Sequence, residues 1–323
     1  MLVIANVIQF WLFLVFVIPS ILCSIFTIYH LLMNRTLRNA LNNHVVIIIL
    51  ILSLIFDLTD VVWLIDYFRT GTASLSTYAF CLIWTYMDFS LFATVIILVA
   101  WASIERHILI FHKRLVATRM KRFVFHYLPM SIFTIYPLSY YFAMFYILPC
   151  NITPDYTQSR CGLAYCAFSS ASNGKWNGIA NNIVPIFIIV MFNLALIARI
   201  WYTKYRTGQR FQWKNYRKLA GQLLAISSIF FIFIFPPMLL YTAYSIGLPF
   251  DFATDYYIVS LFLTYFGALL VPVVCAVSLS ELRTKLWNTF RIFHRPRVHM
   301  VPQILLVNHP RDNQIVRETQ FGS

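Results

Sequence analysis

The sequence predicts an all-α integral membrane protein, a bundle of seven membrane-spanning helices followed by a short amphipathic helix at the membrane surface. Of its 323 residues, 60% are hydrophobic and only 11% are charged, whereas a soluble domain carries roughly 25% charged residues. Seven separate segments are apolar over lengths that cross a hydrocarbon core of about 30 Å. Basic residues gather in alternate connections between those segments, as they do in multi-pass membrane proteins.

The distribution of the basic residues predicts how the chain is oriented. The expected spans are 8–33, 44–67, 79–111, 122–148, 177–203, 217–246 and 255–278. Twenty of the 25 Lys and Arg residues fall in one set of alternate connections and in the tail, whereas Arg69, Arg160 and Lys175 fall in the other set. This asymmetry predicts a plasma-membrane protein with an extracellular N-terminus and a cytoplasmic C-terminus. The net charge of +14 then belongs to a face that suits anionic membrane lipid and an acidic protein partner, and nucleic acid is not needed to explain it.

The third span is distinguished by the polar residues along it. Residues 81–104 carry a single charge, Asp88, in a segment that begins at Cys81 and is followed by Glu105 and Arg106. Ionisable groups are costly inside a membrane, so each one is a candidate functional residue. Glu105 and Arg106 predict an ion pair at the inner end of the bundle, from which the guanidinium is released to a partner's carbonyl groups. The alternative is an arginine that reaches the membrane surface without a specific role.

The second span contains three acidic residues. Asp57 and Asp60 are three residues apart and therefore share a helix face, which must point into the bundle rather than into lipid. The simplest interpretation is one buried structural carboxylate, with Asp66 solvated at the outer end.

Four cysteines are expected on the outer side of the membrane. Cys81 lies at the outer end of the third span, and Cys150, Cys161 and Cys166 lie in the longest outer loop. Two disulfides can form among them, and counting alone leaves three pairings open. Asn151 begins an Asn-Ile-Thr sequon in the same loop and is the candidate glycosylation site.

The last spans contain prolines, and the tail changes composition. Prolines that kink membrane helices are expected at Pro185, Pro236 and Pro272. Residues 1–278 form the predicted seven-transmembrane domain. Residues 279–293 have the pattern of a basic amphipathic helix on the inner leaflet, and residues 294–323 are polar and predicted to be disordered.

These features together resemble a rhodopsin-like (family A) G-protein-coupled receptor over residues 7–290. The spacing in the third span is the most specific part of the resemblance. Asp88 lies seven residues after Cys81, and Arg106 lies 25 residues after it, as do the ligand-anchoring carboxylate and the inner-motif arginine of many family members. The prolines of the last three spans are similar to the family's signature prolines.

The resemblance implies an outer ligand site and an inner docking site. Asp88 would anchor the cationic group of an amine or a short peptide, with Tyr265 donating a hydrogen bond; the alternative is an internal Asp88–Tyr265 contact without a ligand. The expected ligand-binding residues are Asp88, Tyr265, Trp84, Met87, Asn181 and Met238. At the inner end a heterotrimeric G protein, and also arrestin, would dock. The expected coupling residues are Glu105, Arg106, His107, Arg217 and Lys218. No cofactor, bound metal or enzymatic activity is expected.

Several positions depart from the family pattern. Ile234 stands where the family has a tryptophan before the proline of the sixth span, and His107 replaces an aromatic residue. Val271 and Cys275 flank Pro272 where the family has Asn and Tyr. These departures keep open a second hypothesis, a receptor-like membrane protein that does not couple.

Other classes of membrane protein fit less well. A retinal protein needs a Schiff-base lysine, and residues 255–278 contain none. A channel or transporter would need a polar stripe along several spans or an internal repeat, and neither is present in the sequence. The scattered histidines have no metal-ligand spacing, which disfavours a metalloenzyme.

Overall fold

A computed structural model describes residues 6–148, 153–163, 167–168, 170–207 and 225–278. In this part of the chain, seven helical segments are long and apolar enough to cross a membrane. They are Asn6–Met33, Leu41–Thr70, Tyr78–Phe111, Arg119–Ile147, Ser172–Tyr202, Ala225–Ile246 and Thr254–Val277. The predicted seven-helix bundle is therefore confirmed, with boundaries within a few residues of those expected where both are described. The predicted start of the sixth span, the amphipathic helix 279–293 and the tail 294–323 lie outside the described residues.

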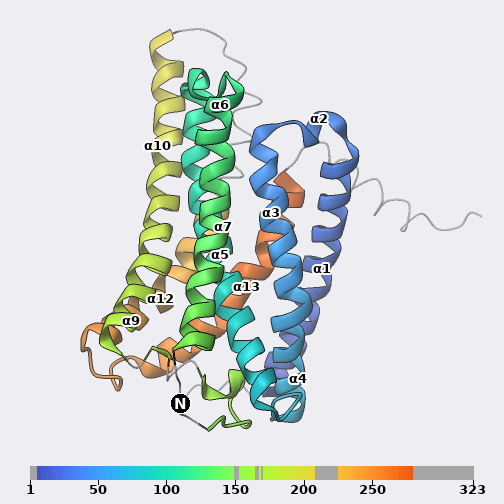
Figure 1. Cartoon of the computed structure of the whole chain (residues 1–323), viewed down its shortest axis with the longest axis vertical. Coiled ribbons are helices and arrows are strands. Elements are labelled where there is room, and N and C mark those ends of the chain that lie inside the picture. The colour runs from blue at the N-terminus through green and yellow to red at the C-terminus, as the bar shows by residue number, and fades with distance from the viewer. Residues whose placement is uncertain (1–5, 149–152, 164–166, 169, 208–224, 279–323) are drawn as a thin grey trace, which may run out of the picture. The chain divides into compact units, whose positions relative to one another are not determined.

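Helix α5 (Tyr78–Phe111) is the centre of the bundle (Figure 1). It packs against α3 (Leu41–Phe56), α7 (Leu128–Phe142) and α10 (Val184–Thr207), which belong to the second, fourth and fifth spans. In the most apolar 18-residue stretch of α5, 72% of the residues are buried, whereas in that of α1 (Asn6–Met33) 28% are buried. Because protein rather than lipid surrounds α5, its polar side chains can find partners on neighbouring helices.

Three hydroxyl groups of α5 are satisfied within the helix itself. Thr85, Thr94 and Ser103 each donate to the carbonyl four residues earlier, at 2.6–2.9 Å. At the start of the helix, the Thr77 side chain accepts a hydrogen bond from the amide of Phe80. These local bonds let three polar side chains lie in an apolar bundle, whereas the Ser90 hydroxyl and Trp101 Nε1 are buried without a partner among the described residues. The ionisable residues of α5 are costlier to bury, so they most need explanation.

Wide π-helical turns interrupt several spans. One, Asp57–Val61, separates α3 from α4 (Val62–Thr70). Two others end two residues before the expected kink prolines: Asn177–Ile183 before Pro185, and Phe230–Ile234 before Pro236. A proline cannot donate a backbone hydrogen bond, and a widened turn accommodates its ring, so kinks are expected at both places.

The third expected kink and the two ends of the bundle complete the fold. Pro272 lies inside α13 (Thr254–Ser278), which is assigned as α-helix throughout. In Figure 1, α2 (Arg35–Arg38) and α6 (Arg119–Arg122) lie at the top, and α4 and α9 (Ala171–Trp176) lie at the bottom. We name the upper end the Arg106 end and the lower end the disulfide end.

Candidate functional site

A disulfide joins the first turn of α5 to the loop after the fourth span. Cys81 is bonded to Cys161, with their Cα atoms 5.7 Å apart. The structure thus selects one of the partners that the sequence left open for Cys81. Cys150, Cys166 and the sequon at Asn151 lie outside the described residues, so their pairing and glycosylation remain predictions.

The loop residues around Cys161 adopt an unusual backbone conformation. Arg160 and Cys161 both lie in the left-handed region, with φ of 55° and 54°, which non-glycine residues rarely adopt. Thr85 donates a hydrogen bond to the Arg160 carbonyl at 3.2 Å, and the Asp155 amide donates to the Cys161 carbonyl at 3.1 Å. Hydrogen bonds from the Thr157 hydroxyl and amide hold the pKa of the exposed Asp155 carboxyl below its usual range.

The side chain of Arg160 reaches Asp88 in α5. Its Nη1 lies 3.1 Å from Asp88 Oδ2, and Tyr265 of α13 donates a hydrogen bond to Asp88 Oδ1 at 2.9 Å. The guanidinium also lies 5.7 Å from the centre of the Tyr265 ring. Asp88 is thus held by a tyrosine, as the resemblance implied, and also by a cation from the protein's own loop, which the sequence reading did not foresee.

A second carboxyl group is buried beside this site. Asp60, in the π-helical turn of the second span, is fully buried and accepts a hydrogen bond from Trp84 Nε1 at 2.8 Å. It is close enough to Asp88 and Arg160 to interact with both charges. Asp60 Oδ2 has no hydrogen-bond partner among the described residues. Asp57 is buried too, and it accepts a hydrogen bond from Ser20 at 2.6 Å. The sequence predicted one buried carboxylate in this span, and the structure has two, because Asp57 and Asp60 both face the bundle.

The remaining ligand-binding candidates lie in different surroundings. Met87 packs against the apolar cluster that contains Cys81, Trp84 and Tyr265. Asn181 is fully buried and accepts a hydrogen bond from Tyr136 of α7. Met238 packs against a separate cluster that contains Phe230 and Ile234. The structure thus brings Asp88, Tyr265, Trp84 and Met87 together, and it assigns Asn181 and Met238 other packing partners.

At the Arg106 end, Glu105 does not form the predicted ion pair with Arg106. Its carboxylate instead contacts His126 Nδ1, from the π-helical turn that precedes α7. His126 Nε2 lies 3.0 Å from His44 Nδ1, and His44 Nε2 lies 2.9 Å from the Arg38 carbonyl. Glu105 and His126 are both buried. The prediction failed because the competing partner lies on another helix and is adjacent only in the folded bundle.

The end groups of this network determine how many protons it holds. The Arg38 carbonyl can only accept, so His44 Nε2 must donate to it. The links from His44 to His126 and from His126 to Glu105 each need one further proton. Three protons among two imidazoles and one carboxyl give a neutral network, whether or not Glu105 itself carries one. The Glu105 carboxyl is therefore hydrogen-bonded to a histidine within this network and makes no direct ion pair with Arg106.

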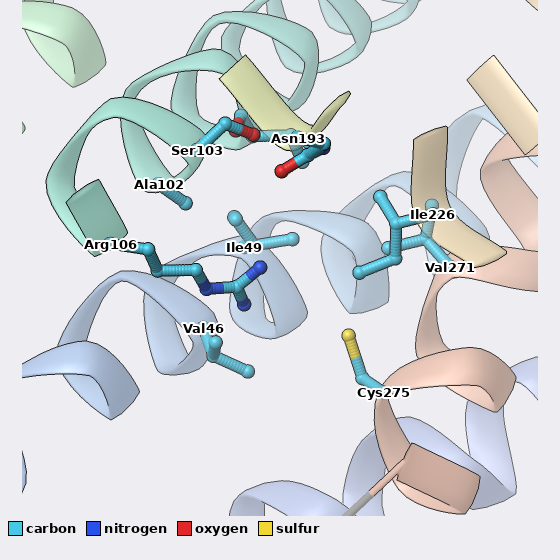
Figure 2. Close-up of a pocket in the computed structure, with 10 residues that line it drawn as sticks. Val46, Ile49, Ala102, Ser103, Arg106, Asn193, Ile226, Val271 and Cys275 are labelled. Carbon is cyan, nitrogen blue, oxygen red and sulfur yellow. The ribbon is translucent and has the colours of Figure 1, made fainter. Parts of the chain in front are cut away.

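Arg106 lines a small cavity between α3, α5, α10 and α13 (Figure 2). The cavity measures about 20 Å³, which is room for one water molecule. Figure 2 shows the guanidinium beside Val46 and Ile49, pointing toward the side from which Cys275 projects. Arg106 is only 7% exposed, and no ion pair to it is recorded among the described residues. A buried guanidinium without a carboxylate in direct contact is a high-energy arrangement that a new partner can relieve.

The other coupling candidates are only partly within the described residues. His107 Nε2 donates to the Phe192 carbonyl of α10 at 2.7 Å, which ties the third span to the fifth. Arg217 and Lys218 lie outside the described residues, so their roles remain predictions. Arg199 of α10, which the sequence reading did not select, stacks over the Phe111 ring at 4.1 Å.

Seven apolar helices, with a disulfide at one end of the third and a buried arginine at its other end, define a seven-transmembrane receptor architecture. Residues 23–275 match the family model described as 7 transmembrane receptor (rhodopsin family). Because the match covers well over half of the chain, the protein belongs to this family and is a multi-pass membrane receptor. No individual curated protein matches it significantly.

Sequence reasoning missed three residues of these sites: Arg160, His126 and His44. Arg160 has a weak signal, because it immediately precedes a cysteine of the disulfide and is one of three basic residues in the outer connections. His44 and His126 are 82 residues apart, and their pairing depends on helix packing that no local pattern encodes.

Proposed function

We propose that this receptor transduces an extracellular cationic ligand, an amine or a short peptide, to a heterotrimeric G protein. Arg106 carries the proposal: it is a buried cation at the end of the central helix, and Glu105 is engaged by His126. A G protein that presents carbonyl groups would supply the missing partners. The distribution of basic residues supports placing the Arg106 end in the cytoplasm and the disulfide end outside the plasma membrane.

The transmission step uses the helices that meet at the cavity. Ligand binding at the disulfide end shifts the bundle between two packings, and the end of the sixth span moves away from Arg106. Ile226 of that span and Val271 and Cys275 of α13 line the cavity with Arg106. Outward movement of Ile226 would open the cavity to the G protein. The basic segments at this end suit arrestin and anionic lipid as further partners.

The test of coupling is Arg106→Ala in a reporter cell with a promiscuous G protein. The expected result is loss of ligand-dependent signalling while surface expression, measured by an N-terminal tag, is retained. Arg199→Ala is the matched control, because Arg199 is a cation at the same end but stacks on an exposed edge of the bundle. Full signalling by Arg106→Ala would refute the proposal.

A ligand screen with amines and short amidated peptides identifies the agonist class. Asp88→Asn is expected to lower the potency of a cationic agonist without abolishing expression, because the amide keeps the hydrogen bond from Tyr265 but loses the charge. Unchanged potency would show that Asp88 only holds the helices together.

One observation favours the alternative of a receptor that binds ligand without coupling. Val271 and Cys275 present apolar surface to the Arg106 cavity where the family has polar side chains. Under this alternative, a ligand would bind to membranes that carry the protein while no G protein responds. A direct binding assay run beside the reporter separates the two functions.

A further inference from the structure

The carboxylate that would anchor a ligand is already paired with a cation of the same chain. Arg160 enters from the loop and contacts Asp88 at 3.1 Å, while its guanidinium faces the Tyr265 ring. Its side chain is 24% exposed, against 10% for Asp88. The cation therefore lies at the mouth of the site, and the carboxylate lies beneath it.

The loop backbone is constrained in a way that directs Arg160 into the bundle. Two consecutive non-glycine residues, Arg160 and Cys161, hold left-handed φ angles, a conformation that costs energy for residues with a Cβ. The disulfide to Cys81, the Thr85 bond and the Asp155 bond hold this turn on the bundle. Strain maintained by several independent contacts is a recurrent property of functional sites.

The chemistry around Arg160 suits a guanidinium group. The guanidinium contacts the buried Asp88 carboxyl, a second buried carboxyl, Asp60, lies close enough to feel its charge, and an aromatic ring lies alongside. A guanidinium offers several planar donors to carboxylates and stacks on aromatic faces, which a compact ammonium does less well. The second carboxyl retains an oxygen, Asp60 Oδ2, without a hydrogen-bond partner in the described part of the chain.

We infer that Arg160 is a tethered internal occupant of the ligand site, and that the external ligand is a guanidinium-bearing peptide that displaces it from Asp88. This inference rests on the proposed function. A tethered group competes at an effective concentration on the order of millimolar or higher. A small free amine has too few other contacts to overcome that competition, whereas a peptide gains them from the loop and the neighbouring helices.

The first test removes the tethered cation and supplies a free one. Arg160→Ala, purified as the full chain in detergent, is expected to unfold at a lower temperature than the wild type, because Asp88 loses its countercharge. Ethylguanidinium chloride at millimolar concentration is expected to restore the melting temperature, with sodium chloride at equal ionic strength as the reference. The ethylguanidinium concentration that gives half of the maximal rise in melting temperature should be at least tenfold lower for Arg160→Ala than for the wild type.

Two control variants make the result specific. Arg69→Ala removes an exposed arginine that pairs with Asp66 at 2.7 Å at the same end of the bundle, and it should neither lose stability comparably nor respond to ethylguanidinium. Arg160→Ala combined with Asp88→Asn should lose the response, because the site no longer carries the charge that binds the probe. An equal response of wild type and Arg160→Ala, or no response of folded Arg160→Ala, would overturn the inference.

If Arg160→Ala does not fold, a second comparison decides the question. Arg160→Gln leaves Asp88 unpaired, whereas Arg160→Gln with Asp88→Asn removes both charges, so the double variant should melt at the higher temperature. The reverse order would overturn the inference. None of these measurements requires G-protein coupling, so a failure of Arg106→Ala to affect signalling is distinguishable from a failure of the Arg160 assignment.

Discussion

Replacement of His126 by phenylalanine should expose how much the Glu105 carboxylate depends on its partner. His126 is fully buried and Glu105 is 2% exposed, so the carboxylate has no route to water when its donor is removed. Loss of one partner of a buried ion pair costs about 3–5 kcal/mol. At roughly 2 °C per kcal/mol for a large domain, the melting temperature should fall by at least about 6 °C.

The companion variants identify the cause of the loss. Glu105→Gln keeps an acceptor for His126 and should cost only about 1 kcal/mol, the difference between a charged and a neutral hydrogen bond. Glu105→Met with His126→Phe removes both polar groups at similar volume and should recover most of the stability lost in His126→Phe. His44, which loses its contact with His126, is partly exposed and can be solvated instead.

The assay is thermal unfolding of the purified wild type and variants, with Glu105→Met alone added so that the double-mutant cycle with His126→Phe closes. Unfolding is monitored by the reaction of buried cysteines with a fluorescent maleimide. The double-mutant cycle should give a coupling energy of about 3 kcal/mol, at the upper end of the range for residues in contact. Additive losses, or a His126→Phe protein as stable as the wild type, would refute the claim that Glu105 is held by His126.

Three further predictions concern the loops and helix packing. Cys161→Ser frees a loop whose ends are 80 residues apart in sequence and should destabilise the fold by up to about 4 kcal/mol; a melting temperature unchanged by this variant and by Cys81→Ser would contradict it. Gly178→Ala puts a methyl carbon 2.4 Å from Thr242 Oγ1 and should lower the free energy of unfolding by about 1–3 kcal/mol. The loss of stability should be smaller in a Thr242→Ala background, and equal losses in both backgrounds would show that the clash is elsewhere. The pKa of Asp155 is lowered in the folded protein, so its ionised carboxylate stabilises the turn at pH values above the usual aspartate pKa. This stabilisation is lost as the pH falls through the lowered pKa. Amide hydrogen exchange of residues 155–161 should therefore rise at acidic pH, and exchange that does not rise would contradict this.

Much of the fold follows from local composition. A run of apolar residues long enough to span a bilayer must be helical, because lipid offers no partner for an unpaired backbone group. The seven spans and the central role of Tyr78–Phe111 could therefore be read from the chain before any contact was known. The π-helical turns could not, because whether the helix widens before Pro185 or Pro236 depends on the neighbouring packing.

The sites divide along the same line. Asp88, Glu105 and Arg106 stand out in sequence because a charged residue in an apolar helix is expensive wherever it lies. Tyr265 was expected beside Asp88, but Arg160 and His126, the other partners of the two carboxyl groups, do not stand out. A cation for Asp88 could come from any basic residue near that end, and a donor for Glu105 from any helix packed beside it.

The sequence by itself determined that seven helices cross the membrane, which polar residues the central helix carries and where its cysteine lies. Only the tertiary structure decided three pairings. Cys161 forms the disulfide with Cys81, Arg160 forms the ion pair with Asp88, and Glu105 contacts His126 rather than Arg106. The reason is physical. The cost of burying a charge depends on the residue type and on the surrounding medium, so it can be predicted from the sequence. The choice of partner depends on distances of about 3 Å between residues that are 21 to 80 positions apart in the chain.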